Sequence, residues 1–277
     1  MMRKTWLITG CSSGLGQYLA RAVTARGDQL IATARNTESL QDLLHQYPER
    51  VRVCQLDVTK PETIQHAISL ADEVFGGVDV LVNNAGYGFF GAIEEGVPDE
   101  YRPMFEVNVF GLIEMTRAAL PLLRRRQGGR IVNLSSSAGI AGSAGAGYYN
   151  ASKFAVEGLS EALDHEVSPL GLRVIIVEPG PFRTDFLGRS MNLAKQQLEI
   201  YEQTAGQRRI YRQNNNGRQP GDPEKAIAVI LKAVDSATPP LHLPLGRAAY
   251  NIVDRKLDRF KQDIDAWRQI AIATDFE

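Results

Sequence analysis

Short apolar runs rich in β-branched residues alternate with longer amphipathic stretches along most of this chain. Such runs are typical of strands in a parallel sheet whose two faces are covered by helices. The predicted strands are Trp6–Thr9, Gln29–Ala34, Arg52–Leu56, Val80–Val82, Arg130–Leu134, Arg173–Val177 and a weaker, proline-flanked Leu241–Leu243. The predicted helices are Leu15–Arg26, Thr37–Tyr47, Glu62–Phe75, Tyr101–Arg126, Tyr149–Ser168, Pro223–Val234 and Tyr250–Trp267. This alternation predicts an α/β fold: a doubly wound, Rossmann-type, mostly parallel seven-stranded sheet with helices on both faces.

One segment does not follow the alternation. Residues 188–221 are rich in Gln, Asn and Arg, and we interpret them either as a segment that covers the substrate or as a surface insertion. No linker-like change of composition divides the chain. We therefore expect residues 1–277 to form a single domain that includes the 188–221 segment.

The overall composition excludes several classes of protein. The formal net charge is −1, so the chain has no electrostatic bias toward nucleic acid or an anionic membrane. Two cysteines are too few for a disulfide framework, and neither has partners at metal-ligand spacing. The N-terminus lacks the apolar core of a signal peptide, and no apolar run approaches the ~20 residues that span a bilayer. We expect a cytoplasmic protein with no membrane span and no bound metal.

A glycine cluster follows the first predicted strand and precedes the first predicted helix. Its residues are Gly10, Ser12, Ser13, Gly14, Leu15 and Gly16. Glycines in this position let the backbone approach a pyrophosphate, which the N-terminus of the following helix attracts. The spacing Gly-x3-Gly-x-Gly differs from the standard dinucleotide fingerprint, and many glycine clusters are plain turns. The position between strand and helix nevertheless favours a dinucleotide site.

The residue after the second strand indicates which dinucleotide is bound. An acid there would bind the ribose 2′-hydroxyl of NAD(H), whereas an arginine accommodates the 2′-phosphate of NADP(H). Arg35 occupies this place, and its planar guanidinium suits phosphate. We therefore expect NADP(H) to be preferred. NAD(H) stays an alternative because a single arginine carries the choice and Ser13 is not basic.

Tyr149 and Lys153 are four residues apart at the start of a predicted helix and share one face. A neighbouring ammonium lowers the pKa of a tyrosine, so Tyr149 is a candidate acid and base. A half-buried tyrosine beside a lysine is the ordinary structural explanation of this pair. The run Ser135–Ser137 ends the fifth predicted strand, where ligands bind in such sheets, and offers a hydroxyl to the substrate oxygen.

Together these motifs closely resemble the short-chain dehydrogenase/reductase family over roughly residues 4–187. The motifs that carry the resemblance are Thr9-Gly10-x3-Gly14-x-Gly16, Asn83-Asn84-Ala85-Gly86, Asn108, Ser136, Tyr149-x3-Lys153 and Pro179-Gly180-x3-Thr184. Residues Glu178–Phe186 and the tail to Gly246 look most like the 17β-hydroxysteroid-dehydrogenase-like branch.

The resemblance implies a role for each matching position. Tyr149 would be the acid and base, Lys153 would bind the nicotinamide ribose, and Ser136 would position the substrate oxygen. Asn108 would hold a water that links Lys153 to solvent. The remaining implied cofactor contacts are Asp57 and Val58 at the adenine, Asn83, Ala85 and Gly86 beside the cofactor, and Pro179, Gly180, Phe182 and Thr184 at the nicotinamide.

The residues expected near the substrate are apolar. They are Tyr87, Phe89, Phe90, Ile140, Phe186, Leu187 and Met191, with no convergent charge. We therefore expect a hydrophobic ketone, aldehyde or secondary alcohol as the substrate of a carbonyl-reductase-type enzyme. Two alternatives are an NADP(H)-binding redox sensor without turnover and an epimerase or dehydratase on the same fold. The resemblance also implies a homodimer or homotetramer in which helices 101–126 and 149–168 pair between subunits.

Overall fold

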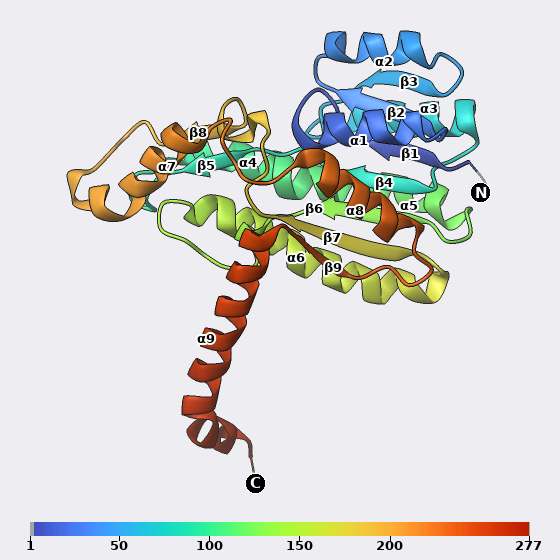
Figure 1. The fold of residues 1–277 in the computed structure, drawn as a ribbon. Helices are drawn as coiled ribbons and strands as arrows, with labels where there is room; N and C mark the ends of the chain where they lie inside the picture. The colour runs from blue at the N-terminus through green and yellow to red at the C-terminus, as the bar shows by residue number, and fades with distance from the viewer. Residues whose placement is uncertain (1–2, 277) are drawn as a thin grey trace.

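The main sheet has seven parallel strands, as predicted, and their order is β3-β2-β1-β4-β6-β7-β9 (Figure 1). The computed structural model describes residues 3–276. The strands are β1 (Thr5–Ile8), β2 (Gln29–Ala34), β3 (Val51–Gln55), β4 (Val80–Asn83), β6 (Arg130–Leu134), β7 (Arg173–Pro179) and β9 (His242–Leu245). The order reverses between β1 and β4, and such a switch point leaves a crevice at the carboxyl ends of the strands.

Helices cover both faces of this sheet because successive strand residues point to opposite sides. Trp6 and Ile8 pack on one face against α1 (Gly14–Ala25), α2 (Gln41–Gln46) and α8 (Pro223–Asp235). Leu7 points to the other face, which α3 (Pro61–Phe75), α5 (Gly111–Arg124) and α6 (Gly147–Val167) cover. The buried strands are therefore apolar at nearly every position.

The predicted helix Tyr101–Arg126 is three elements in the structure. α4 (Pro98–Phe105) begins at a proline, which suits the first turn of a helix. A π-helical turn, η2 (Glu106–Phe110), then precedes α5. The prediction of one regular helix is wrong at this turn, and the turn carries Asn108.

The segment 188–221 is connected to the body by a two-stranded sheet that the sequence pattern did not reveal. β5 (Gly88–Phe90) pairs in parallel with β8 (Met191–Leu193). The segment continues through the single turns η6 (Glu199–Tyr201) and η7 (Glu202–Gly206) into α7 (Gln207–Asn215). The fully buried carboxylate of Glu95 accepts a hydrogen bond from the Leu198 amide and pairs with Arg209. The segment is thus tied to the body at several points.

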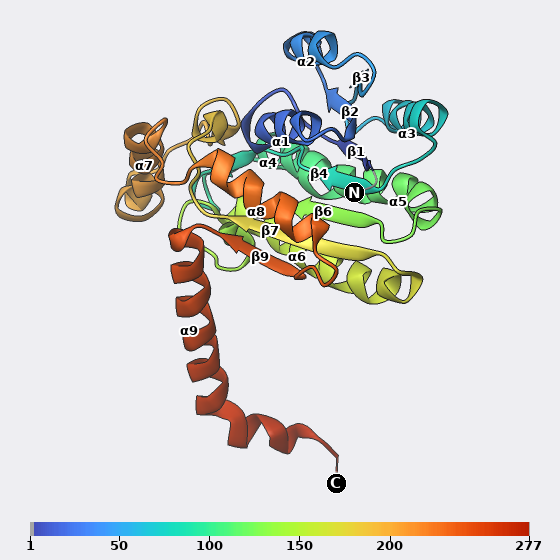
Figure 2. The same cartoon turned by 45° about the vertical axis from the view of Figure 1, so that its right-hand side comes forward.

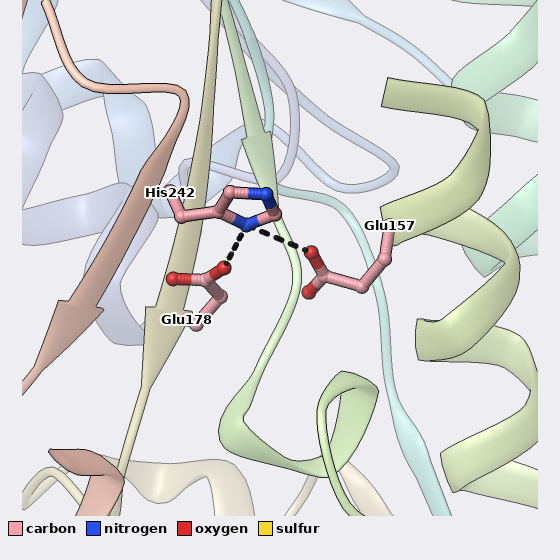
Figure 3. A group of neighbouring side chains, drawn as sticks. All are labelled: Glu157, Glu178 and His242. Carbon is pink, nitrogen blue, oxygen red and sulfur yellow. Dashed lines mark hydrogen bonds and ion pairs between the residues drawn. The ribbon is translucent and has the colours of Figure 1, made fainter. Parts of the chain in front are cut away.

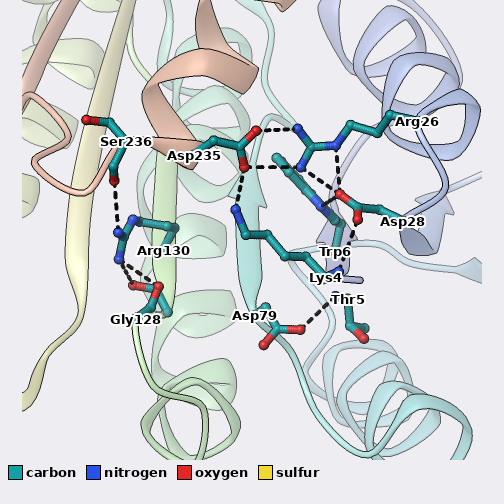
Figure 4. Close-up of polar contacts among 11 residues, drawn as sticks. Lys4, Thr5, Trp6, Arg26, Asp28, Asp79, Gly128, Arg130, Asp235 and Ser236 are labelled. Atoms are coloured by element: carbon teal, nitrogen blue, oxygen red, sulfur yellow. Dashed lines mark hydrogen bonds and ion pairs between the residues drawn. The ribbon is translucent and has the colours of Figure 1, made fainter. Parts of the chain in front are cut away.

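A network of ion pairs lies at the amino ends of the strands (Figure 4). Asp28 accepts hydrogen bonds from the backbone amide of Lys4 at 3.0 Å, the indole of Trp6 at 2.9 Å and the guanidinium of Arg26 at 2.7 Å. Arg26 and the Lys4 ammonium both pair with Asp235 at the end of α8. These contacts fasten α1, β1 and α8 to one another.

The last long helix leaves the body of the molecule. α9 (Arg247–Ala271) begins after Gly246, whose φ of +83° favours glycine, and is longer than the predicted Tyr250–Trp267. Both views show it extending from the end of β9 into solvent (Figures 1 and 2). Three further single turns are η1 (Glu38–Leu40), η4 (Ser168–Leu170) and η8 (Ile272–Thr274). Within residues 3–276, no helix combines the length and apolarity needed to cross a membrane.

Candidate active site

A cleft of about 1620 Å³ lies at the carboxyl ends of the strands. Most of the residues predicted for the cofactor and the chemistry line it. These are Gly10, Ser12, Ser13, Gly14, Leu15, Arg35, Asp57, Val58, Ala85, Gly86, Ser136, Tyr149, Lys153, Pro179, Gly180, Phe182 and Thr184. Three predicted residues, Gly16, Asn83 and Asn108, lie behind this lining. The strand order explains the convergence, because the motifs follow neighbouring parallel strands.

The glycine loop fits a diphosphate. Gly10 and Gly14 have φ angles of +72° and +58°, which side chains other than hydrogen rarely allow, and a Cβ on Gly14 would meet no atom within 4 Å. Gly16 serves packing instead: a Cβ there would lie 2.3 Å from Asn84 Nδ2. α1 begins at Gly14, so its first amide groups face the cleft with the partial positive charge of a helix N-terminus.

Asn84 and Thr9 hold this loop against the end of β4. Asn84 Nδ2 donates to the carbonyl oxygens of Thr9 and Gly10 at 2.8 and 2.9 Å. Thr9 Oγ1 accepts from the amides of Asn84 and Ala85, each at 2.9 Å. Asn83, in contrast, is buried in the sheet and donates to Asn133 and Thr116. The amide that shapes the loop is therefore Asn84, which the sequence placed in the motif without a role of its own.

Arg35 is exposed at the far end of the cleft, next to Asp57. Partial burial acts to raise the pKa of Asp57, but hydrogen bonds from Thr59 and the charges of Arg35 and Lys60 hold it below its ordinary value. Asp57 Oδ1 accepts from the Thr59 amide at 3.0 Å, so its carboxylate closes a turn after β3. The geometry leaves the Arg35 guanidinium accessible to an anion in the cleft.

Ser136, Tyr149 and Lys153 line one part of the cleft. Tyr149 and Lys153 are 7% and 6% exposed on the first turns of α6. Lys153 Nζ donates to the Leu134 carbonyl oxygen at 2.6 Å and lies 5.9 Å from the centre of the Tyr149 ring. Ser136 follows β6, and its hydroxyl accepts the Ala138 amide at 3.1 Å. The geometry brings the three side chains together, as the sequence predicted.

The pKa of Tyr149 moves in the direction opposite to the one predicted. Burial raises it to about 12, against a smaller lowering by the nearby Ser136 hydroxyl. Burial also lowers the pKa of Lys153 to about 8, although the Glu157 carboxylate opposes this. The expected lowering is absent because the ammonium contacts the Leu134 carbonyl rather than the phenol oxygen, so desolvation prevails. Tyr149 is therefore a neutral phenol at neutral pH, which is the form that donates a proton.

Asn108 supports the wall of the cleft from behind. Its Oδ1 accepts the Tyr87 amide at 3.0 Å, and its Nδ2 donates to the Tyr87 carbonyl at 2.8 Å and to Ser152 Oγ at 3.2 Å. A Cβ on Gly86 would lie 3.0 Å from Asn108 Oδ1 and 3.8 Å from Lys153 Nζ. Asn108 thus joins η2, the loop after β4 and α6 close to Lys153.

The Pro179–Thr184 turn closes the cleft beside the end of β9. The Gly180 amide donates to the Leu245 carbonyl at 3.0 Å, and the Thr184 amide donates to the Phe182 carbonyl at 2.9 Å. Thr184 Oγ1 accepts the Phe186 amide at 3.4 Å as the cap of a short helical turn, η5 (Asp185–Leu187).

The remaining part of the cleft is apolar at its wall and cationic at its rim. Of the predicted apolar residues, Tyr87, Phe90, Phe186, Leu187 and Met191 line the cleft, whereas Phe89 and Ile140 do not. The expectation of no convergent charge is wrong. The lining has more bases than acids: the bases are Arg35, Arg102, Lys153, Arg189, Arg208, Arg255, Lys256 and Arg259, and the acids are Asp57, Asp99 and Glu106. Arg208 packs over Phe90 and Tyr211 and donates to Ser143 at 2.6 Å.

Sequence reasoning missed a cluster of two buried acids and a histidine, formed by Glu157, Glu178 and His242 (Figure 3). His242 Nδ1 lies 2.7 Å from Glu178 Oε1 and 3.7 Å from Glu157 Oε2, and Glu157 also bonds Ser135 Oγ. Burial raises the pKa of Glu157 to about 7; the Ser135 hydrogen bond opposes this and the Glu178 charge adds to it. The sequence offered one signal of this cluster, the spacing of Glu157, which is four residues after Lys153 on α6 and shares its face.

Comparison with known proteins identifies the family. The model of the short chain dehydrogenases matches residues 4–194. The chain belongs to this family. A short-chain dehydrogenase from Streptomyces avermitilis is 43% identical, with a TM-score of 0.93 over 99% of this chain and 100% of that one. Oxidoreductase BOA17 of Botryotinia fuckeliana is 35% identical over 99% of this chain and 100% of its own length.

The branch suggested by the sequence is also supported. The 17-beta-hydroxysteroid dehydrogenase type 6 of Mus musculus is 39% identical over 68% of this chain and 60% of its own length. Solved structures of similar fold hold NADP in some cases and NAD in others. The chain is therefore an oxidoreductase of the family with a hydroxysteroid-dehydrogenase-like sequence, and its dinucleotide preference and substrate are matters for proposal.

Proposed function

We propose that this chain transfers hydride between NADP(H) and a hydrophobic ketone, aldehyde or secondary alcohol. The observation that carries the proposal is the convergence of Ser136, Tyr149 and Lys153 in one cleft with the glycine loop. When bound, the nicotinamide accepts or supplies the hydride. Ser136 hydrogen-bonds the substrate oxygen, and Tyr149 donates its proton to that oxygen in reduction or takes one in oxidation.

The side chains around Tyr149 determine how readily its hydroxyl group gives up or takes up a proton. Lys153 stabilises a phenolate, and its pKa of about 8 leaves it mostly charged at neutral pH. Asn108, through Tyr87 and Ser152, supports the wall near the ammonium, and we propose that it also holds the water by which Lys153 reaches solvent. Because this cation does not lower the pKa of the resting phenol, its stabilising effect comes as negative charge develops on the Tyr149 oxygen during proton transfer.

Tyr149→Phe tests the chemistry, because it removes the hydroxyl and keeps the ring that packs 5.9 Å from Phe186. We expect kcat to fall by at least about 10²-fold, as for the loss of a positioned acid and base. Binding of NADPH, measured by titration calorimetry, should be unchanged. Near wild-type kcat in this variant would refute the assignment, and Tyr148→Phe serves as the matched control on the adjacent ring.

We propose that NADP(H) is preferred and that Arg35 binds its 2′-phosphate. Arg35 is exposed at the cleft end, and the acid closest to it, Asp57, is engaged by Thr59. Arg35→Ala should weaken NADPH binding by roughly 10- to 150-fold, the equivalent of 1.5–3 kcal/mol for a charge-assisted hydrogen bond. NADH binding should change little. Equal weakening of both dinucleotides would make Arg35 structural, and tighter NADH binding by the wild type would reverse the preference.

We propose that residues 188–221 cover the substrate. Met191, Arg208 and Tyr211 of this segment line the same cleft as Tyr149. An apolar wall with a cationic rim suits a hydrophobic body, and the rim adds attraction for an anionic tail. A panel of neutral hydrophobic carbonyls and their carboxylate-bearing analogues, assayed as kcat/KM with NADPH, tests this. Activity limited to small polar carbonyls would contradict it.

A further inference from the structure

α9 carries an apolar stripe with a regular spacing. Its residues, alternately three and four apart, are Tyr250, Val253, Leu257, Phe260, Ile264, Trp267 and Ala271. This is the a/d pattern of a two-stranded coiled coil, whose seam must face another helix. The stripe runs almost the whole length of the helix.

From Leu257 onward, nothing in residues 3–276 covers the stripe, whereas Val253 is half-buried. Leu257, Phe260, Ile264 and Trp267 are 59%, 55%, 45% and 66% exposed. In the described part of the chain, Ala249 is the one α9 side chain that is buried, and the views show the rest of the helix directed away from the sheet (Figures 1 and 2). An isolated helix of this kind gains little stability in water, and a contiguous apolar surface of this size marks an interaction site.

We propose that α9 pairs with α9 of a second copy of this chain as an antiparallel coiled coil centred between Leu257 and Phe260. In this register Leu257 packs on the second copy's Phe260. Val253 then faces Ile264, and Tyr250 faces Trp267. Every apolar layer from Tyr250 to Trp267 is filled by a residue of the same stripe. The contact is isologous, so it closes as a dimer.

The charges beside the stripe select this orientation. Asp254, Lys256, Lys261 and Asp263 occupy the positions that flank a coiled-coil seam. In the antiparallel register Asp254 faces Lys261 and Lys256 faces Asp263, so both kinds of flanking pair are attractive. A parallel, in-register pair would instead place Lys256 against Lys261, which repel, and Asp263 against Arg268, so that one flanking pair opposes the other. Within the helix, Lys261 also pairs with Asp265 at 2.7 Å.

The polar face of α9 is suited to a protein partner rather than a lipid surface. Membrane-surface helices carry a basic polar face. Here four acids are interspersed among six bases along the helix, and several form pairs within it, such as Arg268 with Asp265 at 2.8 Å and Arg259 with Asp263 at 4.0 Å. The second copy also presents the complementary charges at the required places.

The first test is the molar mass of the full chain by light scattering. Leu257→Glu/Phe260→Glu should halve the molar mass of the wild-type particle, to 30.5 kDa if that particle is a dimer. Gln262→Glu, on the outer face, is the matched control and should not change it. Retained kcat/KM would show that the double variant is folded. An unchanged molar mass in the folded double variant would overturn the proposal, even if other surfaces of the chain also form contacts between copies.

Tryptophan fluorescence gives an independent readout. The chain has two tryptophans, and Trp6 is fully buried, so quenching by acrylamide reports on Trp267. Pairing predicts that Trp267 is shielded at micromolar concentration and accessible in the double variant. Equal quenching in both proteins would contradict pairing. A shift of Trp267 emission only on adding phosphatidylcholine–phosphatidylserine vesicles would assign α9 to a membrane surface instead.

Disulfide formation distinguishes the two orientations. Cys11 and Cys54 are buried, which leaves introduced cysteines as the reactive thiols. A mixture of Leu257→Cys and Phe260→Cys chains should form a mixed disulfide on oxidation, whereas each variant alone should form little. Efficient self-crosslinking of Leu257→Cys alone would show a parallel pair and overturn the proposed register.

Discussion

The two edges of the main sheet use charge in opposite ways. At the amino ends of the strands, acids pair with bases: Asp28 with Arg26, and Asp235 with both Lys4 and Arg26 (Figure 4). Toward the carboxyl ends, Glu157 and Glu178 lie against one another and share a histidine (Figure 3). Among the described residues, Glu157 Oε2 and Glu178 Oε2 are buried without a hydrogen-bond partner.

This difference separates stability from chemistry within one fold. At the amino edge, each acid is paired with a base in the folded state, and these pairs connect segments that are distant in the sequence. Buried like charges at the carboxyl edge disfavour ionisation and shift pKa values, as is common at functional sites. A substitution at the amino edge should therefore change unfolding with little effect on turnover, and one at the carboxyl edge should change pH dependence.

The largest expected effect on stability is at the inner acid of the amino edge. Asp28→Ala leaves the buried Trp6 indole and the Arg26 guanidinium without their shared acceptor. We expect a loss of about 3–5 kcal/mol in the free energy of unfolding, as for a broken buried ion pair. Urea denaturation measures it, with Asp28→Asn as the control that keeps an acceptor. A fall in kcat/KM of the folded variant would contradict the separation of the two edges.

An intermediate effect is expected at Glu157, and it depends on pH. Its folded pKa of about 7 exceeds its ordinary 4.5, so the folded state binds the proton more tightly than the unfolded state does. The stabilisation of the folded state by this bound proton is fully present below pH 4.5 and is lost as pH rises through 7. In Glu157→Gln the free energy of unfolding should therefore fall less over this pH range than in the wild type, by up to about 3 kcal/mol. Parallel stability curves for wild type and variant between pH 4.5 and 7 would show that the carboxyl does not titrate in this way.

The smallest effect is expected at the outer acid of the amino edge. Asp235 is 30% exposed and pairs with Arg26 at 2.7 Å. Asp235→Asn should reduce the free energy of unfolding by only about 0.5–1 kcal/mol, and less at 1 M salt, because solvent and ions screen partly exposed pairs. Melting of both proteins at low and high salt measures it. A loss as large as that of Asp28→Ala would mean that the network acts as one unit.

The sequence predicted the part of the site that depends on strand order. The glycine loop, Ser136 and Arg35 follow predicted strands, and parallel pairing brings strand ends together whatever lies between them. Tyr149 and Lys153 were predictable for a different reason, because helical spacing is local. These predictions need only periodicity and the rule that connects strand ends to ligand sites.

What the sequence missed depends on contacts between distant segments. Strands β5 and β8 have three residues each and lie about a hundred residues apart, so neither shows a period. The direction of the Tyr149 pKa depends on burial and on the carbonyl that Lys153 contacts, which spacing does not show. The π-turn at Asn108 and the cationic rim from α7 and α9 have the same origin.

The small sheet of β5 and β8 joins two loops that line different parts of the cleft. β5 directly follows the Asn84–Tyr87 stretch at the dinucleotide end of the cleft, and β8 is the root of the segment over its apolar end. Main-chain hydrogen bonds, including Gly88 N to Ser190 O at 2.7 Å, leave the two loops little freedom to move separately. A ligand that restricts the motion of the first loop therefore restricts the motion of the second as well. For the proposed reaction we therefore expect ordered binding, with the dinucleotide before the carbonyl compound, whose part of the cleft is then already fixed in shape.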